Sequence, residues 1–176
     1  MGALVKMDNA ATEVRTRQEP EQYLTFLLGG EMFAIGILVI KEIIEFGQVT
    51  EVPRMPGCVR GVINLRGAVV PVIDLSVRFG RPVTEPGRRT CIVIVETGEG
   101  EARQVIGVMV DAVSEVLEIP QADIEPAPGF GTRIRADFIA GMGKVRGRFV
   151  MILNVEQVFL IDEMAGLDTA ETQVAH

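Results

Sequence analysis

The chain has 176 residues, 48% of them apolar, and a formal net charge of -7. This length and apolar content suffice for one domain of ordinary size or two very small ones. An acidic chain with one tyrosine and no tryptophan lacks the basic face and stacking aromatics of nucleic-acid binding, so that class is excluded. The longest apolar run, 32–40, is too short to span a bilayer, and the first residues lack the apolar stretch of a signal peptide. A cytosolic protein is predicted.

Residues for catalysis and metal binding are sparse. The only histidine is His176, so no Ser-His-Asp or Cys-His pair and no histidine-rich metal site can be assembled. Cys58 and Cys91 lack the spacing of a metal or redox pair and are predicted to be reduced, packed thiols. Phosphate-binding and calcium-binding loop motifs do not occur either. The sequence therefore predicts no catalytic residue, no cofactor and no metal, and a β-barrel enzyme with carboxylate chemistry is the less favoured alternative.

The first part of the chain indicates a leader followed by short strands. Residues 1–20 show no sustained hydrophobic period, which predicts a disordered leader. Alternating apolar residues on both sides of Gly29-Gly30 predict a first hairpin. The segment 36–40 predicts a kink or one helical turn before a strand over 41–46. Two prolines and a glycine then make 52–57 a connector of little freedom.

The clearest hairpin lies at the centre of the first half. Two apolar strands, Val59 to Leu65 and Ala68 to Ile73, are joined across Arg66-Gly67, where glycine permits the positive φ of a tight reversal. Strand alternation predicts one face made of Val59, Gly61, Ile63 and Leu65. Pro71 has no N–H to donate, so the second strand is predicted at a sheet edge or beside a bulge. The hairpin thus presents an arginine at its tip.

Short helices and further strands follow this hairpin. Asp74 or Ser76 is predicted to cap a short helix that ends at Gly80. Strand residues return at 90–95, and another short helix is expected over 154–161. Asp74 is interpreted as a cap rather than an acid catalyst, because the sequence supplies no second polar partner for catalysis.

An internal repeat is the most informative pattern. The segment 33–45 aligns without a gap to 106–118, at an offset of 73 residues, and 59–75 aligns to 139–155, at an offset of 80. A longer connector, 120–131, accounts for the change of offset. Two β units of about 65 residues each are marginal alone, so a core shared between them is expected.

The spacing of strands predicts the fold class. Short strands separated by Gly and Pro, without a long helical period, favour a mostly β protein of two small barrels over a sandwich or an α/β fold. The expected organisation is a first β-barrel unit over 21–82, a linker over 83–89, a second β-barrel unit with C-terminal helical turns over 90–165, and a frayed tail over 166–176. The basic region from Arg78 to Arg89 is interpreted as a solvated loop, with a docking patch as the alternative.

Four motifs then occur in a specific order. They are the run at 33–45, the tip Asn64-Leu65-Arg66-Gly67, its continuation Pro71-Val72-Ile73-Asp74-Leu75, and the echo of the first run at 106–118. Together they resemble the CheW family of chemotaxis coupling proteins over about residues 22–165. The resemblance implies two SH3-like five-stranded β-barrels packed around a shared hydrophobic core, with short helices. It also implies a non-catalytic adaptor between transmembrane chemoreceptors and the histidine kinase CheA.

The same resemblance implies site residues, each with a plainer alternative. The positions that match the family's receptor-binding residues are Ile40, Gly61, Arg66, Gly107 and Val113; no kinase-binding residue can be assigned. Turn chemistry alone would make Arg66 a solvated hairpin residue. The aliphatic residues of the two aligned runs are expected to be mostly core, with one or two of them lining a groove; they are Ile40, Ile43, Ile44, Val113, Val116 and Leu117. Glu42 and Glu115 are interpreted as solvated charges on strand faces that would also suit a partner's cation.

The implied partners are the chemoreceptor cytoplasmic tip and the regulatory domain of CheA, without nucleic acid or direct membrane insertion. The protein is expected to be a monomer in isolation, cytoplasmic, and recruited to receptor arrays at the inner membrane face. The alternatives are an adaptor of a chemosensory pathway with a pilus or other non-flagellar output, and a CheW-like module of a larger protein.

Overall fold

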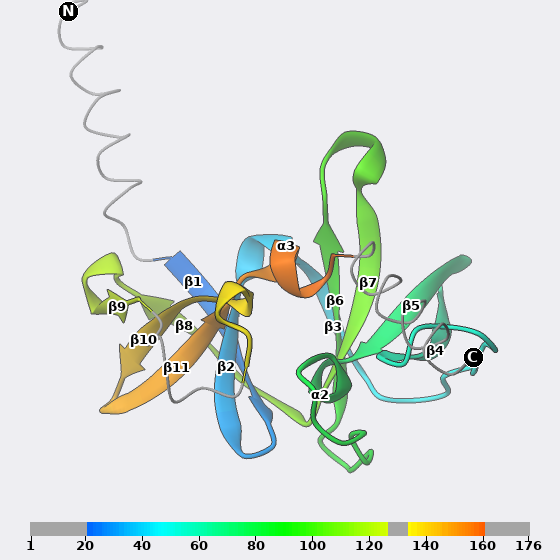
Figure 1. The fold of residues 1–176 in the computed structure, drawn as a ribbon, viewed down its shortest axis with the longest axis horizontal. Helices are drawn as coiled ribbons and strands as arrows, with labels where there is room; N and C mark the ends of the chain where they lie inside the picture. Colours follow the sequence, from blue (N-terminus) through cyan, green and yellow to red (C-terminus); the bar gives the residue numbers. More distant parts are fainter. Residues whose placement is uncertain (1–20, 127–133, 161–176) are drawn as a thin grey trace, which may run out of the picture.

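The computed structural model describes residues 21–126 and 134–160; the predicted leader and frayed tail lie outside that part of the chain. The described protein is mostly β, as predicted, and its two sheets form the two sides of the molecule (Figure 1). We refer to the six-stranded sheet, in the order β8-β1-β2-β11-β10-β9, as barrel A. The five-stranded sheet, in the order β3-β6-β7-β5-β4, is barrel B.

The strands of the two barrels correspond one to one, apart from the short β9. Barrel A consists of β8 (Ala112–Ile119), β1 (Glu21–Leu28), β2 (Glu31–Gly36), β11 (Arg148–Leu153), β10 (Ile139–Val145) and β9 (Ile124–Glu125). Barrel B consists of β3 (Ile40–Glu45), β6 (Cys91–Thr97), β7 (Gln104–Val110), β5 (Ala68–Asp74) and β4 (Val59–Leu65). Each barrel contains one parallel pair, β11 with β2 and β5 with β7, and otherwise antiparallel neighbours.

Short helices connect these strands. The 3₁₀ turns are η1 (Ile37–Val39), η2 (Gly100–Ala102), η3 (Gln121–Asp123) and η4 (Ala136–Phe138). The one-turn α-helices are α2 (Leu75–Arg78) and α3 (Val155–Val158). Asp74 caps α2 and Asn154 caps α3, each by accepting a backbone N–H bond, which confirms the helical turns expected at these places.

The two halves of the repeat exchange strands. β1 and β2 come from the first half but pair with β8 and β11 of the second, while β6 and β7 of the second half pair with β3 and β5 of the first. Each barrel therefore takes strands from both 21–82 and 90–165, and the boundary between those segments does not separate the barrels. The helical turn η1, at the predicted kink, is where the chain leaves barrel A for barrel B.

The central hairpin differs from the sequence expectation in two respects. β5 is not an edge strand, because β4 flanks one side and β7 the other; its pairing with β7 begins at Val72, one residue beyond Pro71. A register shift between Val59 and Gly61, opposite Ile73 and Val72, is the bulge that was predicted near Pro71 as the alternative to an edge, and it also breaks the alternation of β4. Val59 consequently packs against the core shared by the barrels, whereas Ile63 packs inside barrel B.

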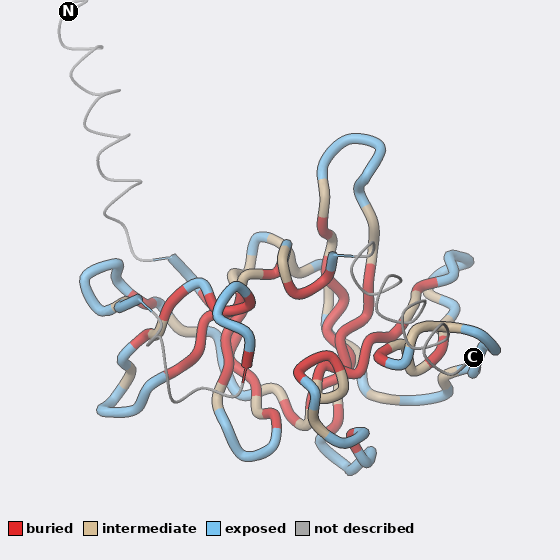
Figure 2. The backbone as a smooth tube through the Cα atoms, viewed as in Figure 1, coloured by how far each residue is buried: buried red, intermediate tan, exposed pale blue. Residues whose placement is uncertain are grey.

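The hydrophobic core has one shared part and two separate parts. The shared cluster joins Phe26 and Phe33 of barrel A to Val93 and Val108 of barrel B, all fully buried. A smaller cluster lies inside each barrel, made of Tyr23, Ala34, Ile119, Val150 and Ile152 in barrel A and of Val72, Ile92, Ile94 and Met109 in barrel B. Figure 2 shows buried backbone on the strands that face the middle of the molecule. The shared core expected from the repeat is present.

A buried cation reinforces the seam between the barrels. Arg78 at the end of α2 is 8% exposed, and its Nε–H donates to the carbonyl of Val158 in α3 at 2.6 Å. Its guanidinium lies 4.6 Å from the ring centroid of Phe138, a cation–π distance. Burial lowers the pKa of Arg78. Since α2 follows barrel B and α3 follows barrel A, these contacts hold the two barrels in one arrangement.

Candidate functional site

The tip of the β4–β5 hairpin has the geometry of a type I′ turn. Arg66 and Gly67 both have positive φ, 52° and 88°, as this turn requires. The backbone N–H of Gly67 donates to Oδ1 of Asn64 at 2.8 Å. A non-glycine residue with positive φ is uncommon, and the local sequence thus holds the Arg66 side chain at the outermost point of the ribbon.

Arg66 forms a two-bond ion pair with Glu42 on β3. Nη1 donates to Oε2 at 2.6 Å and Nη2 to Oε1 at 3.1 Å, the forked geometry that suits a guanidinium and a carboxylate. These hydrogen bonds lower the pKa of Glu42 and raise that of Arg66. The Arg66 side chain is still 75% exposed. Because β3 and β4 are the two outer strands of the five-stranded sheet, the pair bridges the open side of barrel B.

The other four predicted receptor-binding residues lie deeper. Ile40 and Val113 are half-buried and pack against the shared core, from β3 and β8 respectively. Gly61 is buried, and a Cβ built there would lie 2.3 Å from the carbonyl oxygen of Thr50. Gly107 is buried against Ile92. Both glycines permit a close approach of other parts of the chain, and Arg66 is the exposed member of the set.

Two exposed aliphatic side chains lie close to Ile40 in the sequence. Leu38 in η1 is 97% exposed and Ile43 on β3 is 42% exposed. Val116, the repeat counterpart of Ile43, is 51% exposed. Both were expected to be core residues, because large aliphatic side chains are most often buried. The signal that could have separated them is strand alternation, which turns Ile43 away from the barrel interior that receives Ile44.

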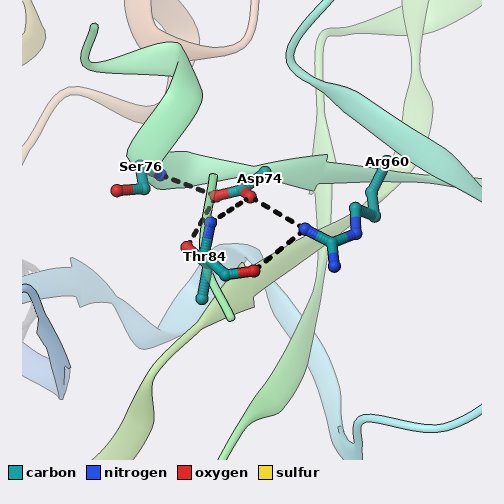
Figure 3. Close-up of polar contacts among 4 residues, drawn as sticks. All are labelled: Arg60, Asp74, Ser76 and Thr84. Carbon is teal, nitrogen blue, oxygen red and sulfur yellow. Dashed lines mark hydrogen bonds and ion pairs between the residues drawn. The ribbon is translucent and has the colours of Figure 1, made fainter. Parts of the chain in front are cut away.

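The Asp74 carboxylate is committed to internal hydrogen bonds (Figure 3). Oδ1 accepts from the Ser76 N–H at 3.0 Å and the Thr84 hydroxyl at 2.8 Å. Oδ2 accepts from the Thr84 N–H at 2.9 Å and from Arg60 at 3.4 Å, and Arg60 also donates to the Thr84 carbonyl at 2.9 Å. The structure confirms the capping role and adds a second one, since Asp74 also ties the linker to the end of β5.

The basic region that follows α2 is partly structural. Arg81 donates to Glu31 at 2.7 Å and so links this region to the β1–β2 hairpin of barrel A. Arg88 and Arg89 are exposed. Together with the buried Arg78, this divides the basic region into two structural arginines and two solvated ones.

Groups suited to metal chemistry are not clustered: within the described residues, no three His, Cys, Asp or Glu side chains gather into a potential metal site. The helices of the same part of the chain are too short or too polar to cross a bilayer. The fold and site define a β-scaffold protein. Its two barrels share a core, its arginine-tipped hairpin is exposed, and its buried Asp74 carboxylate accepts hydrogen bonds from within the chain.

The comparisons with known proteins agree with that class. A family model described as the CheW-like domain matches residues 22–163. The chain therefore belongs to the CheW-like family, as the motifs predicted.

Relatives and a solved structure are similar over most of their length. The chemotaxis protein CheW of Klebsiella aerogenes is 34% identical over 148 residues, which cover 84% of this chain and 87% of that protein. CheW of Rhizobium meliloti is 33% identical over 142 residues, 81% of this chain and 89% of the relative. The crystal structure of the scaffolding protein TtCheW from Thermoanaerobacter tengcongensis has a TM-score of 0.72 and 33% identity, and covers 81% of this chain and 90% of that one.

Proposed function

We propose that this protein is a non-catalytic coupling protein that bridges transmembrane chemoreceptors and the histidine kinase CheA. Its membership of the CheW-like family over 22–163 supports the chemotaxis role. The observation that carries the receptor contact is the arginine tip, where the 75% exposed side chain of Arg66 pairs with Glu42 on β3, the strand that also carries the half-buried Ile40 and the exposed Ile43.

The receptor surface in this proposal combines one cation with aliphatic area. A receptor tip presents helical ridges, which can bury aliphatic side chains while the guanidinium of Arg66 binds a carbonyl or carboxylate. Ile40 and Val113 would form the floor, Leu38 and Ile43 would add exposed area, and Gly61 and Gly107 would shape the backbone beneath. Such contacts are modest individually and gain strength from repetition in an array.

Signal transfer in this proposal requires a stiff connection. The shared core, the buried contact of Arg78 with Val158 and the Asp74 linkage with Thr84 support the role of a rigid spacer between receptor and kinase. The protein would act in the cytoplasm, as a monomer recruited to receptor arrays through its partners. The internal bonds of Asp74 speak against carboxylate catalysis, the runner-up class, and a non-flagellar output remains compatible with the same surfaces.

The test compares the two equivalent hairpin tips. Arg66→Glu and Arg146→Glu are assayed by co-sedimentation with receptor-containing membranes, with and without purified CheA, and by thermal melting. We expect Arg66→Glu to lose receptor binding, Arg146→Glu to keep it, and both to melt as the wild type does. Equal loss in the two variants, or loss of folding with loss of binding in Arg66→Glu, would refute the assigned contact.

A charge exchange separates the contact from the internal pair. The double variant Glu42→Arg with Arg66→Glu restores an ion pair across barrel B but reverses the charge at the tip. We expect it to fold normally and to remain unable to bind receptor. Recovery of receptor binding would mean that Arg66 acts only through Glu42.

A further inference from the structure

The two one-turn helices meet at the place where the two repeats meet. α2 and α3 are equivalent in the repeat, and Arg78 and Val158 are the last residues of each. They are separated by 80 residues, the offset of the second half of the repeat. The 2.6 Å bond from Arg78 to the Val158 carbonyl joins them directly. Because equivalent positions touch each other only near the axis that relates two repeats, this bond spans the centre of the seam.

The side chains around this axis are not equivalent. Phe138 precedes β10 and lies 4.6 Å from the guanidinium of Arg78, while its counterpart before β4, at the same offset of 80 residues, is Cys58. The ring of Phe79 lies 5.9 Å from that of Phe138 and 5.5 Å from that of Phe33 in barrel A. A cation and stacked rings therefore fill one side of the axis and a smaller thiol the other, so that close packing favours one orientation of the barrels.

Each short helix is also followed by a contact with a hairpin of the opposite barrel. After α2, Arg81 donates to Glu31 beside the β1–β2 turn at 2.7 Å, in an exposed position. After α3, the carbonyl of Phe159 accepts from the side chain of Gln104 on β7 at 3.4 Å. The bond donated by Arg78 is buried and shorter than either. As a charge-assisted bond in buried surroundings, it should be the strongest of these three attachments.

The receptor surface proposed above is built from both barrels. Ile40 lies on β3 of barrel B and Val113 on β8 of barrel A, and the two are counterparts at the offset of 73 residues. Both pack against the shared cluster that contains Phe138 and Val158. Because this interior is closely packed, a change in the angle between the barrels shifts Ile40 relative to Val113.

We propose that Arg78 is a positioning residue for receptor binding. Its bond to Val158 and its contact with Phe138 fix the angle between the barrels, and that angle sets the spacing of Ile40 and Val113. The inference rests on the proposed function and extends it to a buried cation that does not itself touch the receptor. A preorganised surface binds more tightly, because its geometry does not have to be restored when the partner arrives.

Residual dipolar couplings of the full ¹⁵N-labelled chain measure the angle between the barrels without any partner. In the wild type, we expect one alignment tensor to fit the backbone amides of both barrels. Arg78→Met keeps a long side chain against Phe138 but has no donor, and we expect the tensors of its two barrels to differ in orientation or amplitude. Arg78→Lys retains a cation that can donate to the Val158 carbonyl, and should restore the single tensor. A wild-type tensor in Arg78→Met would overturn the proposal.

Co-sedimentation with receptor-containing membranes measures the consequence for binding. We expect Arg78→Met to weaken receptor binding about tenfold and Arg78→Lys to bind nearly as well as the wild type. The stability control is Ile152→Ala, because Ile152 packs inside barrel A and outside the shared cluster. This control should lower the melting temperature but leave the tensor and receptor binding unchanged. Equal weakening in Arg78→Met and Ile152→Ala, or unchanged binding in Arg78→Met, would refute the positioning role.

A second variant keeps the test decisive if Arg78→Met does not fold. Phe138→Leu removes the ring and leaves the donor of Arg78 in place, and it should shift the tensors and weaken receptor binding in the same direction. A folded Phe138→Leu protein with wild-type tensors and wild-type binding would overturn the proposal. Absence of receptor binding by the wild type would refute the coupling function and this inference with it, whereas receptor binding that Arg78→Met retains in full would refute this inference alone.

Discussion

Barrel A and barrel B share one strand arrangement but differ in how their interiors and tips are finished. Ile94 fills barrel B where Thr25 lines an opening in barrel A. The tip of barrel B carries one arginine held by two bonds to Glu42, whereas that of barrel A carries three cations and a single 3.3 Å contact. The two repeats thus kept the same backbone pairing, to which any residue type can contribute its N–H and C=O groups, while the side chains at the open ends diverged.

The outer side of the hairpin shows which features both barrels need. In barrel B, Thr50 pairs with Val62 beside Gly61. In barrel A, Glu125 of β9 pairs with Met142 beside Gly141, the equivalent place. In each case a buried glycine lets another segment approach the hairpin closely. The sixth strand of barrel A and the single bridge of barrel B are therefore versions of one feature.

The largest loss of stability is expected when a side chain replaces the glycine at this close approach. Gly61→Ala places a Cβ 2.3 Å from the Thr50 carbonyl oxygen at a φ of 155°, so the backbone must move, and we expect a loss of about 3 kcal/mol. At Gly141→Ala the nearest atoms are Cγ2 of Ile124 at 2.7 Å and the carbonyl oxygen of Glu125 at 3.2 Å. Only a side-chain atom lies under 3.0 Å there, and it belongs to the two-residue strand β9, so a smaller shift and a loss of about 1–2 kcal/mol are expected. Urea unfolding of both variants measures the difference. Equal losses would show that the two approaches are equally rigid.

The second largest effect is expected at the helix caps, where Asp74 should contribute more to stability than Asn154. Asp74→Ala leaves the buried N–H and hydroxyl of Thr84 and the Ser76 N–H without an acceptor, at a cost of about 2–3 kcal/mol. Asn154→Ala loses one 3.3 Å bond to Gln157, typically worth about 0.5–1 kcal/mol. Chemical denaturation compares the two, and Asp74→Asn controls for shape. If Asp74→Ala cost no more than Asn154→Ala, the linkage to Thr84 would contribute nothing to stability.

The filled interior can be opened by one substitution. Ile94→Thr gives barrel B the residue of barrel A, and we expect about 2 kcal/mol of destabilisation from lost packing and a buried hydroxyl. The comparison variant is Val93→Thr, at the neighbouring position of β6 that faces the shared core; the free energy of unfolding of both variants is measured by chemical denaturation. A neutral result for Ile94→Thr would indicate that the barrel interior collapses around the smaller side chain.

The smallest effect concerns pH and the exposed pairs. Because the fold lowers the pKa of Glu42 from 4.5, the unfolded chain binds the proton more tightly. The stabilisation is thus present above the unfolded pKa and lost as pH falls through the folded one. Glu42→Gln should be slightly less stable than the wild type at neutral pH and equal to it once Glu42 is protonated. Thermal melting from pH 7 down to about pH 3 tests this; a difference that persists at low pH would contradict it.

The sequence predicted local structure well where single residues determine it. Gly29-Gly30, Arg66-Gly67 and the cap Asp74 each specify a turn or helix start through their own backbone preferences, and each stands where predicted. Of the two alternatives that Pro71 predicted for β5, the sheet edge was wrong and the nearby bulge was right. β5 lies between β4 and β7, its pairing with β7 begins just past Pro71, and the register shift in β4 lies opposite Val72 and Ile73. The exposure of Ile43 was missed for a related reason, since a strand residue's surroundings depend on which face of the barrel it occupies.

The sequence by itself determined a duplicated, mostly β chain, its hairpins, and the motifs of the CheW-like family, because turn preferences, alternation and repeats are properties of neighbouring residues. Only the tertiary structure decided that the halves exchange strands, that Arg66 pairs with Glu42, and that barrel A is open where barrel B is filled. These features depend on contacts between residues far apart in the chain. The strands of each repeat could pair with one another or with strands of the other repeat, and both arrangements would bury nearly the same pattern of apolar residues. The choice is made by how the shared core packs.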